Sequence, residues 1–145
     1  MKLEENISAF TYKTPISIRF ADMDMFGHAN NAVYLTYFEQ ARSAYWKDII
    51  EWDWKATGII LVKSEVEYLK PILLEDKITA CVKTTRVGNS SFDIAYLLYA
   101  DEGEHFILKT IGKTTQVAID YKSGKPVAIP QAEKAKMIAY DNPEM

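Results

Sequence analysis

The first third of the chain changes from a strand-like to a helix-like pattern of apolar residues. Residues 14–20 alternate between apolar and polar, which predicts a half-buried strand. From residue 31 to about residue 47, polar residues recur at helical spacing and leave most of the circumference apolar, so other structure must wrap this helix. Asn30 stands just before it and is the expected N-cap. The polar stripe of the helix consists of Thr36, Glu39, Gln40, Ser43 and Lys47.

Beyond Gly58 the pattern predicts four strands joined by turns. Apolar and polar residues alternate in residues 59–69, 76–87, 92–100 and 106–120. We expect these strands to form a meander of consecutive hairpins, and therefore an antiparallel sheet, because parallel strands need long crossover connections. The predicted architecture is a single α+β domain over residues 1–145. Its five-stranded antiparallel sheet wraps around one long central helix, and residues from about 130 to 145 contain a short helix.

Composition limits the function classes. The 145 residues, 48% hydrophobic and 26% charged, are enough for one packed core and too few for two comfortable domains. No window approaches twenty consecutive apolar residues, and the opening MKLEENISAF lacks the features of a secretory signal, so we expect a cytoplasmic protein. The net charge of −3 argues against nucleic acid as a partner. The single cysteine, Cys81, is expected to be a structural residue rather than a nucleophile, and His105 a surface residue.

Potentially reactive side chains are concentrated between the first strand and the helix. The first N–H groups of a helix have no internal partner and carry partial positive charge, which suits an oxyanion. A carboxylate in the preceding loop, such as Asp24, can attack a carbonyl or activate water while the Asn31 N–H receives the developing charge. Asp and Asn in such places are also ordinary caps and turn formers, and this second interpretation stays open. The group consists of Asp22, Asp24, Gly27, His28, Asn30 and Asn31.

The same loop contains residue types that bind metal ions in other proteins. Its D-x-D-x-x-G spacing resembles a calcium loop, but Phe26 and Val33 occupy positions where that loop needs oxygen ligands. A site built from Asp22, Asp24 and His28 would lack a further clustered ligand. We therefore expect no metal here, with the three-residue site as the alternative.

Residues 19–42, RFADMDMFGHANNAVYLTYFEQAR, closely resemble the signature of the hotdog-fold acyl-CoA thioesterases of the 4-hydroxybenzoyl-CoA thioesterase family. Residues 87–92 (VGNSSF) resemble the hairpin between the third and fourth strands of that family, and residues 117–130 its closing strand and turn. The resemblance implies the same sheet-around-helix fold as the pattern. It also implies hydrolysis of an acyl-CoA thioester to free acid and CoA, with no cofactor.

The resemblance assigns roles within the first block. Asp24 corresponds to the catalytic carboxylate, acting either as nucleophile through a mixed anhydride or as general base. The Asn31 N–H would polarise the thioester carbonyl, and His28 would fix the loop or take part in catalysis. Gly27 would allow close approach of the substrate and Asn30 would shape the loop.

Other residues receive roles with more than one interpretation. Tyr34 would line the acyl pocket or pack under the sheet, and Glu39 is the reserve candidate for the carboxylate, because another branch of hotdog thioesterases uses a helix Glu. Lys109 and Lys113 are expected to be solvated strand-edge lysines, with added positive charge for the CoA phosphates as the alternative. The hairpin residues expected near the CoA nucleotide are Arg86, Gly88, Ser90 and Ser91.

The resemblance also implies a homodimer or homotetramer with the site at the subunit interface. The main alternative function is a non-catalytic hotdog module that binds acyl-CoA or acyl-lipid. A hydratase using Asp24 and His28 is a further alternative, and a carrier-protein thioester could replace acyl-CoA as substrate.

Overall fold

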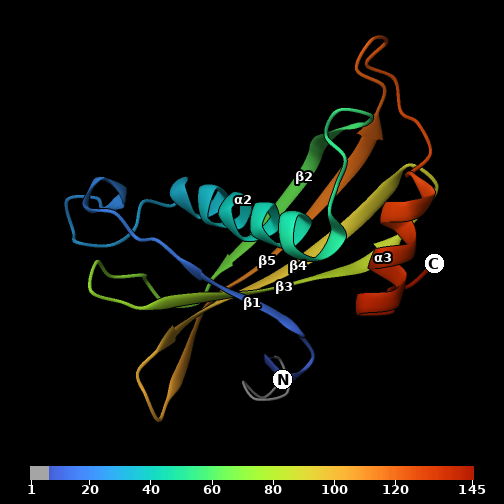
Figure 1. Ribbon diagram of the computed structural model, residues 1–145. Helices are drawn as coiled ribbons and strands as arrows, with labels where there is room; N and C mark the ends of the chain where they lie inside the picture. The colour runs from blue at the N-terminus through green and yellow to red at the C-terminus, as the bar shows by residue number, and fades with distance from the viewer. Residues whose placement is uncertain (1–6) are drawn as a thin grey trace.

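The computed structural model describes residues 7–145. Residues 1–6 lie outside the described residues, and they include over half of the opening MKLEENISAF on which the expectation of no secretory signal depends. The strands form one antiparallel sheet in the order β1-β3-β4-β5-β2, and α2 lies across one face of it (Figure 1). The elements are β1 (Tyr12–Ile16), a 3-10 turn η1 (Phe20–Asp22), α2 (Val33–Tyr45), a π-helical turn η2 (Trp46–Ile50), β2 (Gly58–Tyr68), β3 (Ile78–Val87), β4 (Ser91–Asp101), β5 (Phe106–Ile119) and α3 (Gln131–Asp141).

The predicted sheet-around-helix architecture is confirmed, but the predicted strand order is wrong for β2. Hairpins join β3, β4 and β5 as expected, whereas β2 pairs with β5 at the far edge of the sheet and not with β3. Residues 69–77 therefore pass beneath the start of α2, where Ile72 is fully buried. Local alternation cannot reveal this crossing, because it is the same whichever strand is the neighbour.

The first strand also ends earlier than predicted. β1 stops at Ile16, and Phe20, expected on the buried side of the strand, is 82% exposed. The reason lies in Asp22, whose carboxylate accepts a hydrogen bond from the Arg19 N–H at 3.0 Å while its own N–H donates to the Arg19 carbonyl. These bonds turn the chain out of the sheet and into η1.

The apolar side of α2 packs on the concave face of the sheet. The Phe38 ring stacks on Tyr96 with centroids 4.5 Å apart and lies directly over Gly112 of β5. The predicted polar stripe forms the exposed side of the helix, with Gln40 half-buried. The buried residues of α2 are Tyr34, Tyr37, Phe38, Ala41, Arg42 and Tyr45.

The C-terminal helix closes the other end of the core. The region expected to contain a short helix holds α3, which contacts β3 and η2. The Asp141 carboxylate at its end accepts hydrogen bonds from the Thr84 N–H at 2.9 Å and from the Tyr45 hydroxyl. Burial raises the pKa of Asp141 above its usual value.

No helix in residues 7–145 is long and apolar enough to cross a membrane.

Candidate active site

Asp22 attaches the loop between β1 and α2 to the helix. Its side chain is only 1% exposed and accepts hydrogen bonds from the Arg19 guanidinium at 2.9 and 3.1 Å and from the Tyr37 hydroxyl at 3.0 Å. Burial alone would raise the pKa of the Asp22 carboxyl, but the bonds from Arg19 and Tyr37 hold this pKa below its usual value. Asp22 is therefore an ionised structural anchor.

Asp24, two residues further on, lies in a tight turn and is exposed. Its Oδ1 accepts hydrogen bonds from the Phe26 N–H at 2.9 Å and the His28 N–H at 3.2 Å. The Asp24 N–H donates to the His28 carbonyl at 2.7 Å, and Gly27 takes the positive φ of +79° that the turn requires. These bonds fix one oxygen of the carboxylate. No hydrogen bond within residues 7–145 uses the other oxygen, Oδ2, so it can face a substrate.

The start of α2 lies next to this turn. The predicted N-cap is wrong, because Ala32 is the N-cap and Asn30 lies two residues earlier. Asn30 instead shapes the turn that leads into the helix, since its Oδ1 accepts a hydrogen bond from the Ala32 N–H at 2.9 Å and its carbonyl accepts one from the Val33 N–H. Val33 is the first helical residue, two later than predicted. Asn31 lies in the turn between them, and its carbonyl accepts a hydrogen bond from the Tyr68 hydroxyl at 3.0 Å. In the described part of the chain the Asn31 N–H donates no hydrogen bond, which leaves it available to an oxyanion.

A pocket of about 200 Å³ brings these groups together. The predicted catalytic residues Asp24, His28 and Asn31 all line it, and so does Tyr34. Tyr34 is buried and meets the Tyr68 ring edge-on at 4.8 Å, so it both packs and forms a wall. The complete lining is Asp24, His28, Ala29, Asn31, Tyr34, Tyr68, Leu69, Lys70 and Pro71.

The wall from residue 68 to residue 71 was not predicted from the sequence as part of the site. Tyr68 ends β2 and the other three residues follow it, about forty positions after Asp24. They reach the pocket only because β2 lies at the edge of the sheet beside β5. Lys70 brings a cation to the pocket. In the sequence, the Lys70-Pro71 pair just after the predicted strand is the one sign that the chain leaves the sheet here. The pair alone does not indicate which end of the helix the chain then approaches.

Lys109 departs from its predicted place as a solvated lysine. It is 7% exposed, and its ammonium donates a hydrogen bond to the Pro71 carbonyl at 2.9 Å and pairs with Asp76 at 3.1 Å. The prediction is wrong because the chain from residue 69 to residue 77 crosses over this part of β5. Lys113, by contrast, is half exposed and lies 3.7 Å from Asp93.

The residues expected to bind the CoA nucleotide lie elsewhere in the same chain. Arg86 pairs with Asp93 at 2.9 Å and donates a hydrogen bond to the Ser91 hydroxyl, and the Gly88 N–H donates to the Ser91 carbonyl. The Ser90 carbonyl accepts a hydrogen bond from β5. This β3–β4 turn lies beside α3, at the opposite end of the molecule from the loop that carries Asp24 (Figure 1). Within one chain, the structure does not bring the two groups together.

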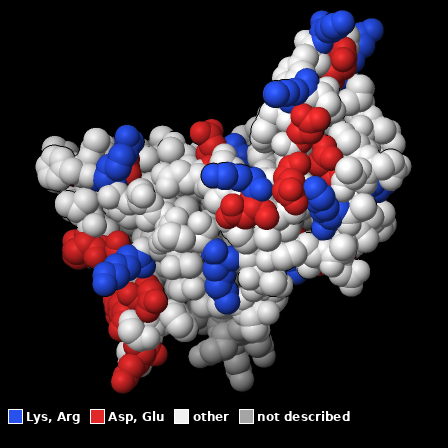
Figure 2. All heavy atoms as spheres, viewed as in Figure 1, with Lys and Arg blue, Asp and Glu red and all other residues white. Residues whose placement is uncertain are grey.

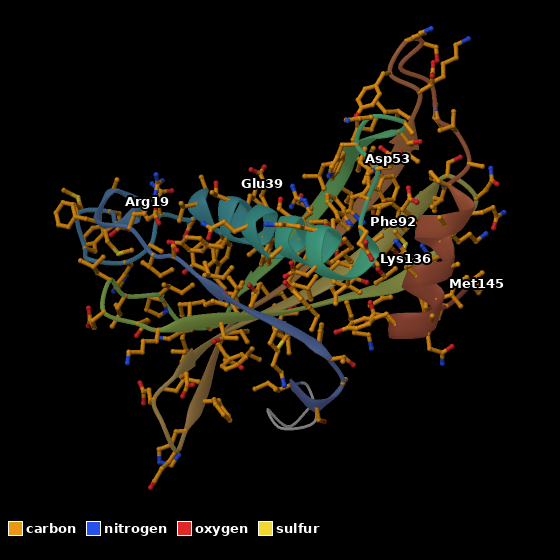
Figure 3. The ribbon with its side chains drawn as sticks, in the orientation of Figure 1. Arg19, Glu39, Asp53, Phe92, Lys136 and Met145 are labelled. Carbon is orange, nitrogen blue, oxygen red and sulfur yellow. The ribbon has the colours of Figure 1, made fainter. Side chains whose placement is uncertain are left out.

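The remaining candidates lie outside the pocket. Glu39 is exposed on α2, points away from the sheet (Figure 3), and is 3.8 Å from the Arg42 guanidinium. Burial raises the pKa of the Cys81 thiol to about 11, so it is a poor nucleophile near neutral pH. His105 is exposed. Within residues 7–145 no three His, Cys, Asp or Glu side chains are grouped to hold a metal ion.

Comparison with known proteins identifies the class. A model of the thioesterase-like superfamily matches residues 18–137, so the chain belongs to this superfamily. A solved thioesterase from Thermus thermophilus, complexed with coenzyme A and Zn, has 31% identical residues and a TM-score of 0.80, with 94% of this chain and 98% of that chain covered. The fold is the hotdog fold, and the protein is a thioester hydrolase, as the sequence resemblance implied.

Two curated relatives extend the comparison. The uncharacterised protein YsmA of Bacillus subtilis (strain 168) is 31% identical over 139 residues, which are 95% of this chain and 92% of that protein. The long-chain acyl-CoA thioesterase FadM of Escherichia coli (strain K12) is 23% identical over 120 residues, or 81% and 89% of the two chains. Similarity over nearly the full length agrees with the extent of the family match.

Proposed function

We propose that the protein is an acyl-CoA thioesterase that uses water to convert an acyl-CoA into a free acid and CoA. The observation that carries this proposal is the meeting of the Asp24 carboxylate and the uncommitted Asn31 N–H at one pocket of about 200 Å³. A carboxylate supplies the attacking or activating group, and an N–H at a helix start stabilises charge on the carbonyl oxygen. The superfamily and its acyl-CoA thioesterase relative FadM support the same substrate class.

Two chemical routes fit these groups. Asp24 Oδ2 can attack the thioester carbonyl and expel the CoA thiolate, and water then hydrolyses the resulting mixed anhydride. Alternatively, Asp24 accepts a proton from water as the water attacks. In both routes the Asn31 N–H receives the negative charge that develops on the carbonyl oxygen. The reaction consumes only water, so the proposal includes neither a metal nor an organic cofactor, and it keeps the cytoplasmic location expected from the sequence.

The proposal includes a second copy of the chain. β2 is an edge strand, and Ile60, Leu61 and Val62 on it are 43–53% exposed. In the Asp24 loop, Met25 and Phe26 are 89% and 76% exposed. Exposed apolar residues along an unpaired strand edge favour pairing with another subunit. A homodimer or homotetramer with its site between subunits would bury them.

That assembly would also give the β3–β4 turn its predicted role. Arg86, Gly88, Ser90 and Ser91 are too far from Asp24 to serve their own pocket, so in the proposed assembly they would approach the pocket of a second copy. Within its own chain, Tyr34 would contact the acyl group. Lys70 would add positive charge on the side where the CoA phosphates enter.

The decisive test measures thiol release from a panel of acyl-CoA thioesters. We expect the wild type to turn over at least one of them, and Asp24→Asn and Asp24→Ala to lower kcat about 100-fold or more with an unchanged fold. Asp101→Asn is the matched control, because Asp101 is also an exposed aspartate that accepts a hydrogen bond from a turn N–H, at 2.9 Å. Wild-type turnover by a folded Asp24→Ala variant would disprove the assignment. Thermal stabilisation by acyl-CoA without thiol release would favour the binding-module alternative.

A further inference from the structure

The buried ion pair of Lys109 and Asp76 lies outside the pocket but is connected to it by hydrogen bonds. The two side chains are 9% and 11% exposed, and their charged atoms are 3.1 Å apart. Isolated charges are costly to bury, so a pair kept in this position needs a reason beyond stability. We propose that this pair positions the Asp24 loop for catalysis, an inference that rests on the proposed function.

The first step of the connection leads from the pair to the crossing segment. The Lys109 ammonium donates to the Pro71 carbonyl at 2.9 Å, and the Lys109 carbonyl accepts hydrogen bonds from the N–H groups of Leu69 and Lys70 at 2.9 and 3.1 Å. Asp76 accepts a hydrogen bond from the Leu73 N–H at 2.8 Å. One lysine and one aspartate thus fix both ends of the segment that follows β2.

The second step leads from this segment to the catalytic turn. The Ile72 carbonyl accepts a hydrogen bond from the Ala29 N–H at 2.8 Å, and His28 forms a β-bridge with Leu73. The His28 N–H in turn donates to the Asp24 side-chain Oδ1, and the His28 carbonyl accepts a hydrogen bond from the Asp24 N–H. Every link from the buried pair to the Asp24 carboxylate is a direct contact. Displacing the segment would move the carboxylate relative to the Asn31 N–H.

The segment also forms part of the pocket wall. Leu69, Lys70 and Pro71 line the pocket, and the Tyr34 hydroxyl accepts a hydrogen bond from the Ile72 N–H at 3.3 Å. Asp22 attaches the loop from the α2 side, so the Lys109–Asp76 pair supplies the attachment from the opposite side. A shift of about 1 Å in a reacting group can cost about 100-fold in rate, which makes this second attachment relevant to catalysis.

The test replaces the pair with apolar residues of similar size, Lys109→Met with Asp76→Leu. Such replacements of a buried ion pair often preserve stability, so the positioning role can be separated from the structural one. We expect the double variant to lower kcat about tenfold to 100-fold with KM for acyl-CoA changed less than about threefold. Asp76→Asn, which keeps an acceptor for the Leu73 N–H, is the second variant and should also lower kcat.

Asp141→Asn is the matched control. Asp141 is a half-buried carboxylate that accepts a hydrogen bond from the Thr84 N–H of β3, at the other end of the core. Its loss should lower the melting temperature and leave kcat unchanged. A kcat within about twofold of wild type in either folded pair variant would overturn the inference. Failure of both variants to fold would overturn it too, because the pair would then be a general stabilising element. The proposed function is judged separately, by wild-type hydrolysis and its loss in Asp24→Asn.

Discussion

Asp22 and Asp24 lie two residues apart, but their carboxylates have different surroundings. Asp22 is buried and receives hydrogen bonds from Arg19 and Tyr37, whereas Asp24 is exposed with one oxygen uncommitted. The residues alone already suggested Asp24 as base or nucleophile, and the family resemblance assigned the catalytic carboxylate to the same residue. The structure supplies a physical reason for that assignment, because a carboxylate saturated with donors is a weaker base and nucleophile.

The buried Asp22 carboxylate leads to a pH-dependent prediction. Asp22→Asn removes charge-assisted hydrogen bonds and should lower the free energy of unfolding at pH 7 by about 2 kcal/mol. Because the folded-state pKa is below the ordinary value of 3.8, this stabilisation is present above that value and is lost as the pH falls through the folded pKa. Urea unfolding at pH 7, 5 and 3 should show the difference between wild type and variant shrinking only at the lowest pH. A difference that stays constant to pH 3 would contradict the role of the Asp22 charge.

At the scale of elements, α2 and β5 depend on one close contact. A Cβ at Gly112 would lie 2.2 Å from Cζ of Phe38, a distance that real side chains do not tolerate. Gly112→Ala should therefore lower the free energy of unfolding by about 1–3 kcal/mol. In a double-mutant cycle with Phe38→Leu, the combined loss should be smaller than the sum of the single losses, because the smaller side chain makes room. Additive losses in thermal or urea unfolding would show that the two residues are not in conflict.

The elements also show how far the sequence could lead. Residues 92–100 and 106–120 were predicted as strands, and β4 and β5 occupy Ser91–Asp101 and Phe106–Ile119, because alternation is a local property of a half-buried strand. The place of β2 beside β5 depends on contacts between distant segments, and no local pattern encodes it. The same limit applies to the site. Asp24 and Asn31 are close in sequence and were predicted together, whereas Tyr68 and Pro71 reach the site only through the fold.

At the scale of the whole molecule, large exposed apolar side chains gather on the loop between β1 and α2. Acidic side chains gather around the β4–β5 hairpin, whereas the loop over the start of α2 is largely uncharged on the face shown in Figure 2. That loop carries Phe20, Met25 and Phe26, all more than 75% exposed. The same loop contributes Asp24 and His28 to the pocket, so the exposed apolar residues lie next to the site, which is the arrangement expected where another subunit covers it.

The β2 edge provides the test of assembly. We expect the wild type, of 16.6 kDa per chain, to sediment as a dimer or tetramer, because pairing of two β2 edges satisfies their free backbone groups and buries their apolar side chains. Val62→Lys places a charge in the middle of that edge and should shift the protein toward the monomer and lower its thioesterase activity. Phe106→Lys is the control, since Phe106 is 41% exposed at the start of β5, and should leave the assembly unchanged. A wild-type protein that is monomeric and fully active would show that one chain holds the complete site.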